Sequence, residues 1–288
     1  MVVVYREFFL NSLHHAMHFS VDLRFNEDGH CKPVVIFIHG FKGFKDWGPF
    51  NLIADQFSQG DFVFVKLNLS HNGTTLRHPK KLVDLEAFAQ NNFSIEMDDI
   101  SVLLDYLFCE KENTFIKECD LTRVFLIGHS RGGSLAILKA CEDKRISAVA
   151  AWSAVSDYSS MWTEKAMALW KKKKMIYVLN KGTRQYLPIY YQIVENFYRY
   201  RERLDISIAI ENLDIPLMII HAKDDTSVPI RMAYELKHWY KRAKLLILDR
   251  GGHTLDAYHP YKRKKLPKAL SKVVCETKSF FTGVDLLK

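Results

Sequence analysis

The residues best suited to chemistry lie near the middle of the chain, in the motif Gly-His-Ser-Arg-Gly at residues 128–132. An apolar run at 124–127 precedes the motif, and a helix-forming run at 134–138 follows it. This context predicts a sharp strand-to-helix turn that presents the Ser130 hydroxyl as a nucleophile, with glycines where strand and helix pass closely. The first backbone N–H groups of such a helix, beginning with that of Arg131, can stabilise a developing oxyanion.

A serine hydroxyl is a weak nucleophile near neutral pH and needs a histidine base, which in turn needs an orienting carboxylate. Both residue types follow predicted strands downstream. The apolar run 216–221 ends before Asp224 and Asp225, and the run 244–248 ends before the loop that contains His253. Since the carboxyl ends of parallel strands meet at one edge of a sheet, we expect these side chains near Ser130.

Four motifs in this order resemble the α/β-hydrolase superfamily, nearest to its dienelactone-hydrolase-like and cinnamoyl- or feruloyl-esterase-like branch. They are His-Gly-Phe at 39–41, Gly-His-Ser-Arg-Gly-Gly at 128–133, Asp-Thr-Ser-Val-Pro at 225–229 and Gly-His-Thr at 252–254. The resemblance covers the chain from about residue 17 to residue 280. It implies an α/β-hydrolase fold: a mostly parallel twisted sheet with helices on both faces and an inserted cap.

The resemblance also implies a role for each matching residue. Ser130 corresponds to the nucleophile, His253 to the base and Asp225 to the acid. The backbone N–H groups of Phe41 and Arg131 correspond to the oxyanion hole. The expected reaction is hydrolysis through an acyl-enzyme intermediate.

Three aspartates compete for the role of the acid. The family pattern places the carboxylate three residues before the valine of Val-Pro, which selects Asp225 over its neighbour Asp224. Asp224 is then a solvated or turn-capping residue. Asp157, after the strand predicted at 147–152, is a more distant alternative and could equally cap the helix that follows it.

Alternating apolar strands and amphipathic helices over 288 residues predict an α/β sheet rather than two separate folds. The segment 95–107 has one apolar face and predicts a helix that covers the sheet. Parallel strands joined by right-handed crossovers are the expected topology. The expected strands are an N-terminal hairpin over about residues 2–25, followed by 34–38, 62–67, 122–127, 146–152, 216–221 and 244–248.

Residues 153–214, called the insertion below, separate two predicted strands by far more than an ordinary connection. The insertion predicts a cap or lid beside the site, on a hydrolase core formed by residues 1–152 and 215–288. A hairpin near 175–182 and a helix over 189–204 are expected within it. Aromatic side chains in and next to it could line an apolar ligand site; the candidates are Trp152, Trp162, Tyr186 and Tyr190.

Most of the 12 histidines are expected to be structural or at the surface. His39 is expected to hold the oxyanion loop in shape and is also a candidate substrate contact. His71 could border the site, although a turn role is the simpler interpretation. The cluster of three histidines at 14, 15 and 18 lacks an acidic or cysteine residue at ligand spacing, so neither a metal nor another cofactor is expected.

The net charge of +8 does not come with a nucleic-acid-binding motif, so solvated basic faces are the expected explanation. Lys171 to Lys174 could still steer an acidic substrate toward the site. Five cysteines without Cys-x-x-Cys spacing do not form a disulfide framework and favour a reducing compartment. No signal peptide or membrane span is evident, so a cytoplasmic protein is expected, and a homo-oligomer is left open.

The function expected from these residues is hydrolysis of a small-molecule carboxylic ester by a serine esterase. A thioesterase, a peptidase or an acyltransferase could use the same three residues, and a non-catalytic ligand-binding homologue is a further alternative. The chain is too short to include the β-propeller of oligopeptidases in this superfamily, which argues against that branch. The sequence does not identify the acyl or alcohol part of the substrate because selectivity depends on loops and the cap.

Overall fold

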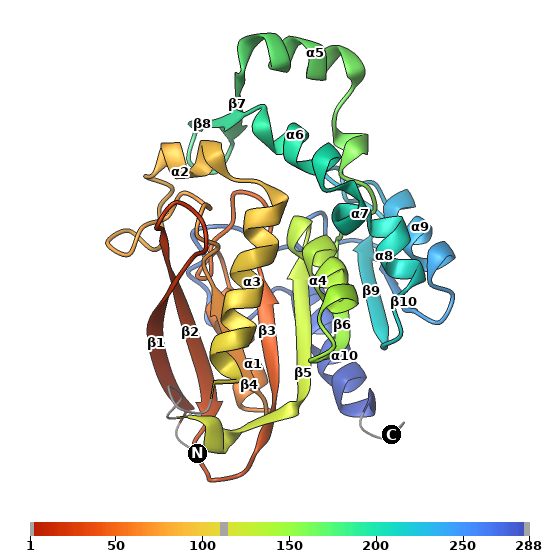
Figure 1. The fold of residues 1–288 in the computed structure, drawn as a ribbon. Helices are drawn as coiled ribbons and strands as arrows, with labels where there is room; N and C mark the ends of the chain where they lie inside the picture. Colours follow the sequence, from red (N-terminus) through yellow and green to blue (C-terminus); the bar gives the residue numbers. More distant parts are fainter. Residues whose placement is uncertain (1–2, 110–114, 285–288) are drawn as a thin grey trace.

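An eight-stranded sheet forms the centre of the computed structural model, which describes residues 3–109 and 115–284 (Figure 1). The strand order is β1-β2-β4-β3-β5-β6-β9-β10. The β1–β2 hairpin is antiparallel, β2 pairs antiparallel with β4, and all later neighbours in this order are parallel. The strands are β1 (Val3–Asn11), β2 (His18–Asn26), β3 (Lys32–Ile38), β4 (Val63–Leu67), β5 (Cys119–His129), β6 (Ile146–Trp152), β9 (Leu217–Ala222) and β10 (Lys244–Leu248).

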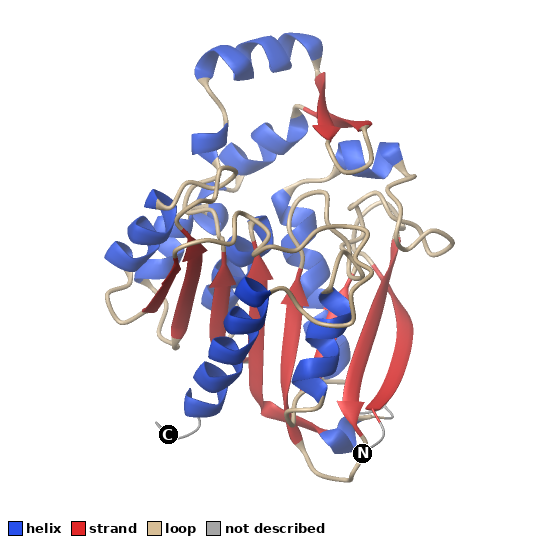
Figure 2. Cartoon of the chain, turned by 180° about the vertical axis from the view of Figure 1, so that it is seen from behind, coloured by secondary structure: helices blue, strands red, loops and turns tan. Residues whose placement is uncertain are grey.

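Helices cover both faces of this sheet. One face packs against α1 (Phe50–Ser58) and α10 (Lys268–Val284), which lie in front of the strands in Figure 2. The opposite face packs against α3 (Phe93–Leu107), α4 (Arg131–Glu142) and α9 (Arg231–Trp239). Because they are covered on both sides, β3 and β9 are buried along their whole length, as near-continuous apolar strands of a parallel sheet are.

Helix α3 begins where the sequence provides a cap. The Asn92 side chain accepts a hydrogen bond from the Ile95 backbone N–H, which satisfies one of the free donors of the first turn. The apolar face expected from the sequence is buried against the sheet, at Ile95, Ile100 and Leu103 among others. A shorter helix, α2 (Leu85–Gln90), precedes it and is capped in the same way by Asp84.

The insertion lies above the carboxyl ends of the parallel strands (Figure 1). It contains α5 (Glu164–Lys173), the hairpin β7 (Met175–Asn180) and β8 (Gln185–Tyr190), α6 (Gln192–Arg199), α7 (Arg201–Leu204) and α8 (Ile206–Glu211). Short 3₁₀ helices occur at Ile116–Glu118 and Ser159–Met161. Helix α5 is mostly exposed and buries only Trp170, whereas α8 packs on α4 and α9 and so forms part of the main body.

The strands predicted from the sequence are present with small shifts at their ends. The helix expected over 189–204 is partly wrong, because Ile189 and Tyr190 pair with β7 and the helical path breaks at Tyr200 into α6 and α7. The N-terminal hairpin is confirmed from Val3 onward, and residues 1 and 2 lie outside the described residues. In the described part of the chain, no helix is both long and apolar enough to cross a membrane.

Candidate active site

Ser130 lies at the turn between β5 and α4, with φ of 58° and ψ of −124°. L-amino acids rarely adopt this conformation, so the turn stores strain that the surrounding structure must hold. The glycines beside it allow the close approach. A Cβ atom on Gly128 would lie 2.0 Å from the Gly132 carbonyl oxygen, and one on Gly132 would lie 2.3 Å from the Ile38 carbonyl oxygen. Only glycine fits at these two positions, which explains the motif on either side of the serine.

Two hydrogen bonds connect Ser130 to an acidic residue through His253. The Ser130 hydroxyl oxygen lies 2.9 Å from Nε2 of His253, and Nδ1 of His253 lies 2.8 Å from Oδ2 of Asp225. The other carboxylate oxygen of Asp225 accepts the backbone N–H groups of Ser227 and Val228, at 2.8 and 2.9 Å. The loops after β5, β9 and β10 therefore bring the three side chains together at the carboxyl edge of the sheet.

Asp225 is buried, and its environment favours the charged form. Burial alone raises the pKa of a carboxyl group, but hydrogen bonds from His221 and His253 and the Val228 N–H hold the pKa of Asp225 well below its usual range. The other two aspartates lie elsewhere. Asp224 is exposed and accepts the Gly252 N–H, while Asp157 accepts hydrogen bonds from Ser159.

Two further histidines hold this arrangement, and the sequence analysis assigned no role to either. Nε2–H of His129 donates to the His253 carbonyl oxygen at 2.8 Å, and burial together with the nearby His253 lowers the pKa of His129 to about 3. His221 is fully buried at the end of β9, and its Nε2 lies 2.8 Å from the Val228 carbonyl oxygen and 3.3 Å from Oδ2 of Asp225. The available signal was position, because each histidine ends a strand beside a predicted site residue.

The loop after β3 lies directly against the Ser130 turn. A Cβ atom on Gly40 would lie 2.9 Å from Cβ of Ser130, so the loop approaches closely because residue 40 is glycine. The next residue, Phe41, lines the cavity at Ser130, and its N–H has no acceptor among the described residues. Arg131 begins α4, where backbone N–H groups lack helical acceptors. The loop after β3 and the start of α4 therefore both lie beside Ser130.

His39 is hydrogen-bonded to the loop that follows it and to the chain after β4. Its Nδ1–H donates to the Gly40 carbonyl oxygen at 2.9 Å, and its Nε2 accepts the Leu69 N–H at 3.3 Å. Burial lowers the pKa of His39 to about 4, so the ring is neutral and can both donate and accept. It is not among the residues that line the Ser130 cavity.

The Arg131 side chain fixes the other side of the turn. Its guanidinium group pairs with Glu96 of α3 at 3.0 Å, and both side chains are buried. The same group lies 4.3 Å from the centre of the Phe41 ring and 5.3 Å from that of Phe93. Two cation–π contacts and a buried ion pair therefore hold α3, α4 and the Phe41 loop together.

The cavity at Ser130 has a volume of about 190 Å³. Besides Ser130 and His253, its walls include three residues that the sequence analysis did not single out: Lys42, Trp47 and Asn180. Asn180 is the last residue of β7, so the insertion contributes to the cavity through the tip of its hairpin rather than through its aromatic cluster.

The other substrate-contact candidates lie away from this cavity, and two of them are buried structural residues. Trp152 lies on the face of the sheet that α1 and α10 cover, where its Nε1–H donates to Thr277 of α10 and its ring packs against Phe37. His71 is fully buried and is hydrogen-bonded to His15 and Ser70. Successive side chains of a strand point to opposite faces of the sheet. Proximity to the site in the sequence therefore did not show which face Trp152 would occupy.

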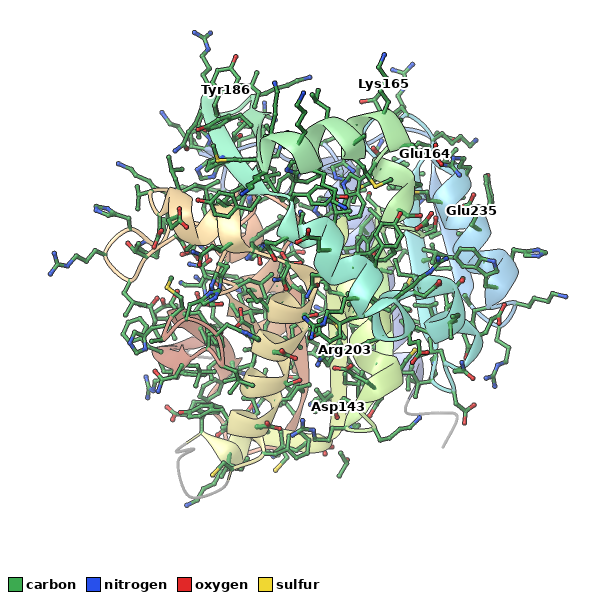
Figure 3. The ribbon with its side chains drawn as sticks, turned by 45° about the horizontal axis from the view of Figure 1, so that its top comes forward. Asp143, Glu164, Lys165, Tyr186, Arg203 and Glu235 are labelled. Atoms are coloured by element: carbon green, nitrogen blue, oxygen red, sulfur yellow. The ribbon has the colours of Figure 1, made fainter. Side chains whose placement is uncertain are left out.

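The candidates within the insertion also do other things. Trp162 packs against Trp170 and Phe197 of the insertion and against Phe93 of α3, which places it between the insertion and the body. Tyr186 is exposed and points outward from the hairpin (Figure 3). The Tyr190 hydroxyl donates to Glu86 of α2 at 2.8 Å and so connects the hairpin to the body.

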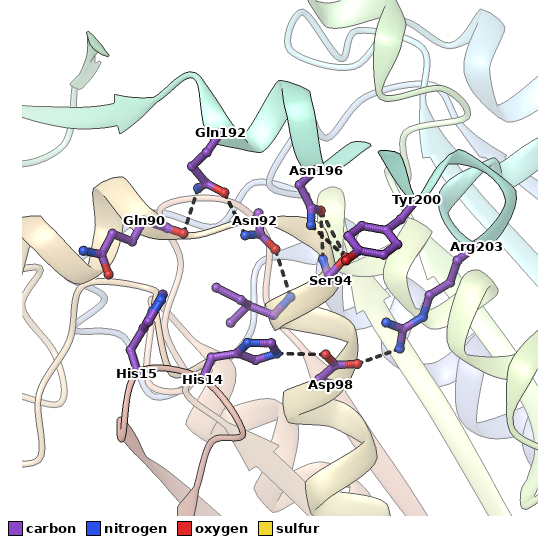
Figure 4. A pocket seen from close by; sticks show the side chains of 11 residues that line it. His14, His15, Gln90, Asn92, Ser94, Asp98, Gln192, Asn196, Tyr200 and Arg203 are labelled. Carbon is purple, nitrogen blue, oxygen red and sulfur yellow. Dashed lines mark hydrogen bonds and ion pairs between the residues drawn. The ribbon is translucent and has the colours of Figure 1, made fainter. Parts of the chain in front are cut away.

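A separate polar cavity of about 490 Å³ lies where α6 meets α2 and α3, a junction called the seam below (Figure 4). Amide side chains cross it. Gln192 donates to the Gln90 carbonyl oxygen at 2.7 Å and accepts from Asn92 at 2.8 Å, and Asn196 donates to Ser94 at 2.9 Å. These side chains already satisfy one another, so the seam attaches the insertion to the body.

A mostly parallel sheet with a strained serine between a strand and a helix, followed along the chain by an aspartate and a histidine at later strand ends, defines an α/β hydrolase. Structural comparison agrees. Est1E from Butyrivibrio proteoclasticus, solved with ferulic acid bound, has a TM-score of 0.72 and 17% identity, covering 97% of this chain and 99% of that chain. A putative dienelactone hydrolase from Klebsiella pneumoniae subsp. pneumoniae MGH 78578 has a TM-score of 0.62 and 10% identity, covering 98% and 99%.

The chain belongs to the prolyl oligopeptidase family, whose model matches residues 86–270. The acylaminoacyl peptidase of Pyrococcus horikoshii shares this fold with a TM-score of 0.66 and 17% identity, covering 98% of this chain but 42% of that chain. Among curated proteins, none matches the sequence. Chain length had argued against an oligopeptidase branch, but the family match lies within the hydrolase fold and needs no propeller. The protein is therefore a hydrolase of a family with both esterase and peptidase structural neighbours.

Proposed function

We propose that the protein hydrolyses carboxylic esters through an acyl-enzyme formed on Ser130. The observation that carries this proposal is the hydrogen-bonded sequence Ser130, His253, Asp225, with distances of 2.9 and 2.8 Å. These lengths suit proton transfer from a nucleophile to a base that a carboxylate orients. The proposed substrate is a small molecule, and the reaction as written needs no cofactor.

In the proposed reaction, His253 takes the hydroxyl proton as the Ser130 oxygen attacks the ester carbonyl carbon. The backbone N–H groups of Phe41 and Arg131 stabilise the negative charge on the carbonyl oxygen; a donor of this kind is worth about 3 kcal/mol. His253 then protonates the leaving alcohol, and a water molecule hydrolyses the acyl-enzyme in a second cycle. Asp225 stays ionised throughout, and its hydrogen bond keeps the proton of His253 on Nδ1 in the resting state.

The insertion is proposed to act as a cap on a core of residues 1–152 and 215–288. Two observations support this role. The tip of its hairpin reaches the Ser130 cavity at Asn180, and Lys42 donates to the Leu179 carbonyl oxygen of the same hairpin at 3.4 Å. A cap attached in this way restricts access from above the strand ends, which suits a substrate that enters beside the hairpin.

Peptide hydrolysis is the second candidate, and the family match to prolyl oligopeptidases favours it. The same serine, histidine and backbone donors can attack an amide carbonyl. The two functions differ in the leaving group, because an amine must be protonated before it departs. Side-by-side measurement of an ester and the matching anilide of one acyl group separates them.

The test combines covalent labelling with turnover. A fluorophosphonate probe is expected to label the wild-type protein, which should also hydrolyse 4-nitrophenyl esters of graded chain length and a feruloyl ester. Ser130→Ala should abolish both signals, since loss of the nucleophile removes several orders of magnitude of rate. Ser160→Ala, at an exposed serine of the insertion, is the control and should retain both. The assignment is overturned if ester turnover survives Ser130→Ala. It is also overturned if the wild-type protein hydrolyses the anilide faster than the matching ester.

A further inference from the structure

A second, larger cavity adjoins the cavity at Ser130. Its volume is about 600 Å³, within the range of small-molecule sites. The two cavities share Lys42, Trp47 and Asn180 as lining residues, so a ligand held in the larger one lies next to the reacting serine. The larger cavity is therefore positioned to hold the part of a substrate that extends beyond the scissile bond.

Part of the lining of this larger cavity is aromatic. Trp47 stacks with His259 at a ring distance of 6.1 Å, and Phe44 meets His259 edge-on at 5.1 Å. Tyr258 and Leu82 extend the apolar lining. Such a surface suits an aryl group or a short aliphatic segment.

The lining of the larger cavity also carries positive charge and includes no acidic residue. Lys42, Lys80 and Lys81 are among its lining residues, whereas neither aspartate nor glutamate is. Lys181 lies close enough to Lys42 for its charge to lower the pKa of Lys42. None of these four lysines forms an ion pair within residues 3–109 and 115–284.

Buried lysines elsewhere in this protein are paired. Lys45 lies 2.7 Å from Asp22, and Lys66 lies 2.8 Å from Asp46. Lys42 is only half-buried, yet burial and the nearby charges of Lys181 and Arg131 lower its pKa. Within the described part of the chain, the Lys42 ammonium group makes one hydrogen bond, the 3.4 Å contact with the Leu179 carbonyl oxygen. A cation at the junction of two cavities without a counter-charge is a place where a bound anion gains free energy.

We infer that the larger cavity is an anion subsite, and that the substrate is an ester with an aryl or short aliphatic segment ending in a carboxylate or phosphate. The inference rests on the proposed ester hydrolysis at Ser130. Lys80 and Lys81 attract the anionic end from the open side, and Lys42 holds it near the shared wall. Lys171 to Lys174 do not contribute, because they lie at the exposed end of α5 and outside both cavities.

The kinetic test uses ester pairs that differ in one charge. The pair 4-acetoxybenzoate and 4-acetoxybenzamide places the charge on the leaving group, and 4-nitrophenyl hydrogen adipate and its monoamide place it on the acyl group. For at least one pair, kcat/KM of the wild-type protein should favour the anion by about tenfold, the size of one charge-assisted hydrogen bond. Lys80→Gln/Lys81→Gln should bring this ratio most of the way down to one, and Lys42→Met should lower it further.

The matched control is Lys171→Gln/Lys172→Gln. It also removes two positive charges, but from α5, and it should keep the wild-type ratio. The subsite inference fails if both wild-type ratios are at or below one while the neutral esters are hydrolysed in a Ser130-dependent way. It also fails if the control lowers the ratio as much as the Lys80/Lys81 variant, because the effect is then long-range steering alone.

A binding measurement separates the subsite from the reaction. In Ser130→Ala, calorimetric titration with 3-phenylpropanoate and phenyl phosphate should give Kd values about tenfold lower than with 3-phenylpropanamide. The Lys80→Gln/Lys81→Gln changes in that background should erase the difference, and the two anions compared with each other show which acid is preferred. Anion preference without any ester turnover overturns the proposed function and supports the subsite; equal Kd values for acids and amide overturn the subsite.

Discussion

Two acidic residues of helix α3, Glu96 and Asp98, lie only two positions apart and form ion pairs that face different regions of the molecule. Glu96 pairs with Arg131 beside the Ser130 turn, and these side chains are 4% and 8% exposed. Asp98 pairs with Arg203 at the seam, and these are 22% and 32% exposed. One helix therefore supports the site with a desolvated pair and the insertion with a hydrated pair.

The same contrast applies to the two regions as wholes. At the site, three side chains are fixed at strand ends. Ser130 has a strained backbone, Gly128 and Gly132 allow backbone approaches that a Cβ atom would block, and Asp225 is buried. At the seam, amide side chains cross a polar cavity of about 490 Å³ (Figure 4). Chemistry depends on positions held to fractions of an ångström, whereas the seam only attaches the insertion to the body. We therefore expect changes at the site to reduce rate, and changes at the seam to loosen the insertion.

The largest expected effect is at Asp225. Asp225→Asn should reduce kcat by about 10⁴-fold, because the amide no longer fixes the tautomer of His253 or stabilises the imidazolium that forms. Asp224→Asn is the matched neighbour and should change kcat by less than about threefold, since the side chain is exposed and contacts only the loop backbone. Ester kinetics of both variants check this. Equal losses at the two positions would mean that the loop, rather than the Asp225 contact, determines the rate.

The next effect compares the two pairs on α3. Glu96→Gln leaves the Arg131 guanidinium buried without its carboxylate and should lower the free energy of unfolding by about 3–5 kcal/mol. Asp98→Asn breaks a hydrated pair and should cost about 1 kcal/mol or less. Urea unfolding of both variants at one pH gives the comparison. Similar losses would show that the difference in exposure does not matter.

A third acidic residue on α3 makes stability depend on pH. Asp99 is fully buried and accepts hydrogen bonds from Ser12 and Ser70, and burial raises its pKa from 3.8 to about 6. The folded state thus holds the proton more tightly than the unfolded state. This contribution to stability is fully present below pH 3.8 and is lost as the pH rises through about 6.

The corresponding prediction uses Asp99→Asn, which cannot ionise. Relative to the wild-type protein, the free energy of unfolding of this variant should rise by about 3 kcal/mol between pH 3.5 and pH 7. Urea unfolding across this range measures the difference at each pH. A difference that stays constant would show that Asp99 does not titrate between the two states in this window.

The smallest effect is expected at the seam. Gln192→Ala/Asn196→Ala removes the amide hydrogen bonds between α6 and the body, worth about 1 kcal/mol each. Hydrogen exchange should become faster in residues 185–204, while the rate of fluorophosphonate labelling at Ser130 stays within about twofold, because the site is held by other elements. Loss of labelling without faster exchange would indicate that the seam supports the site directly.

The sequence predicted the site better than its surroundings. Ser130, Asp225 and His253 could be assigned because each follows an apolar strand, and parallel strands deliver their ends to one edge. His129 and His221 stand near strand ends beside predicted site residues, but their hydrogen bonds to carbonyl oxygens and the contact of His221 with Asp225 became visible only in the structure. The aromatic candidates failed for a related reason. Composition indicated a cap, but not which face each ring would occupy.

What the sequence determined by itself was therefore the order of strands and the residues at their ends, since hydrophobic period and glycine positions are local signals. The tertiary structure alone decided which side chains line the cavities. Asn180 lines the cavity at Ser130 because the β7–β8 hairpin folds over the strand ends. Lys42 and Lys80 line the same larger cavity although they are 38 positions apart in the sequence. Such contacts depend on how separate elements pack against one another. That packing is determined by burial of the whole core, and no short segment of sequence encodes it.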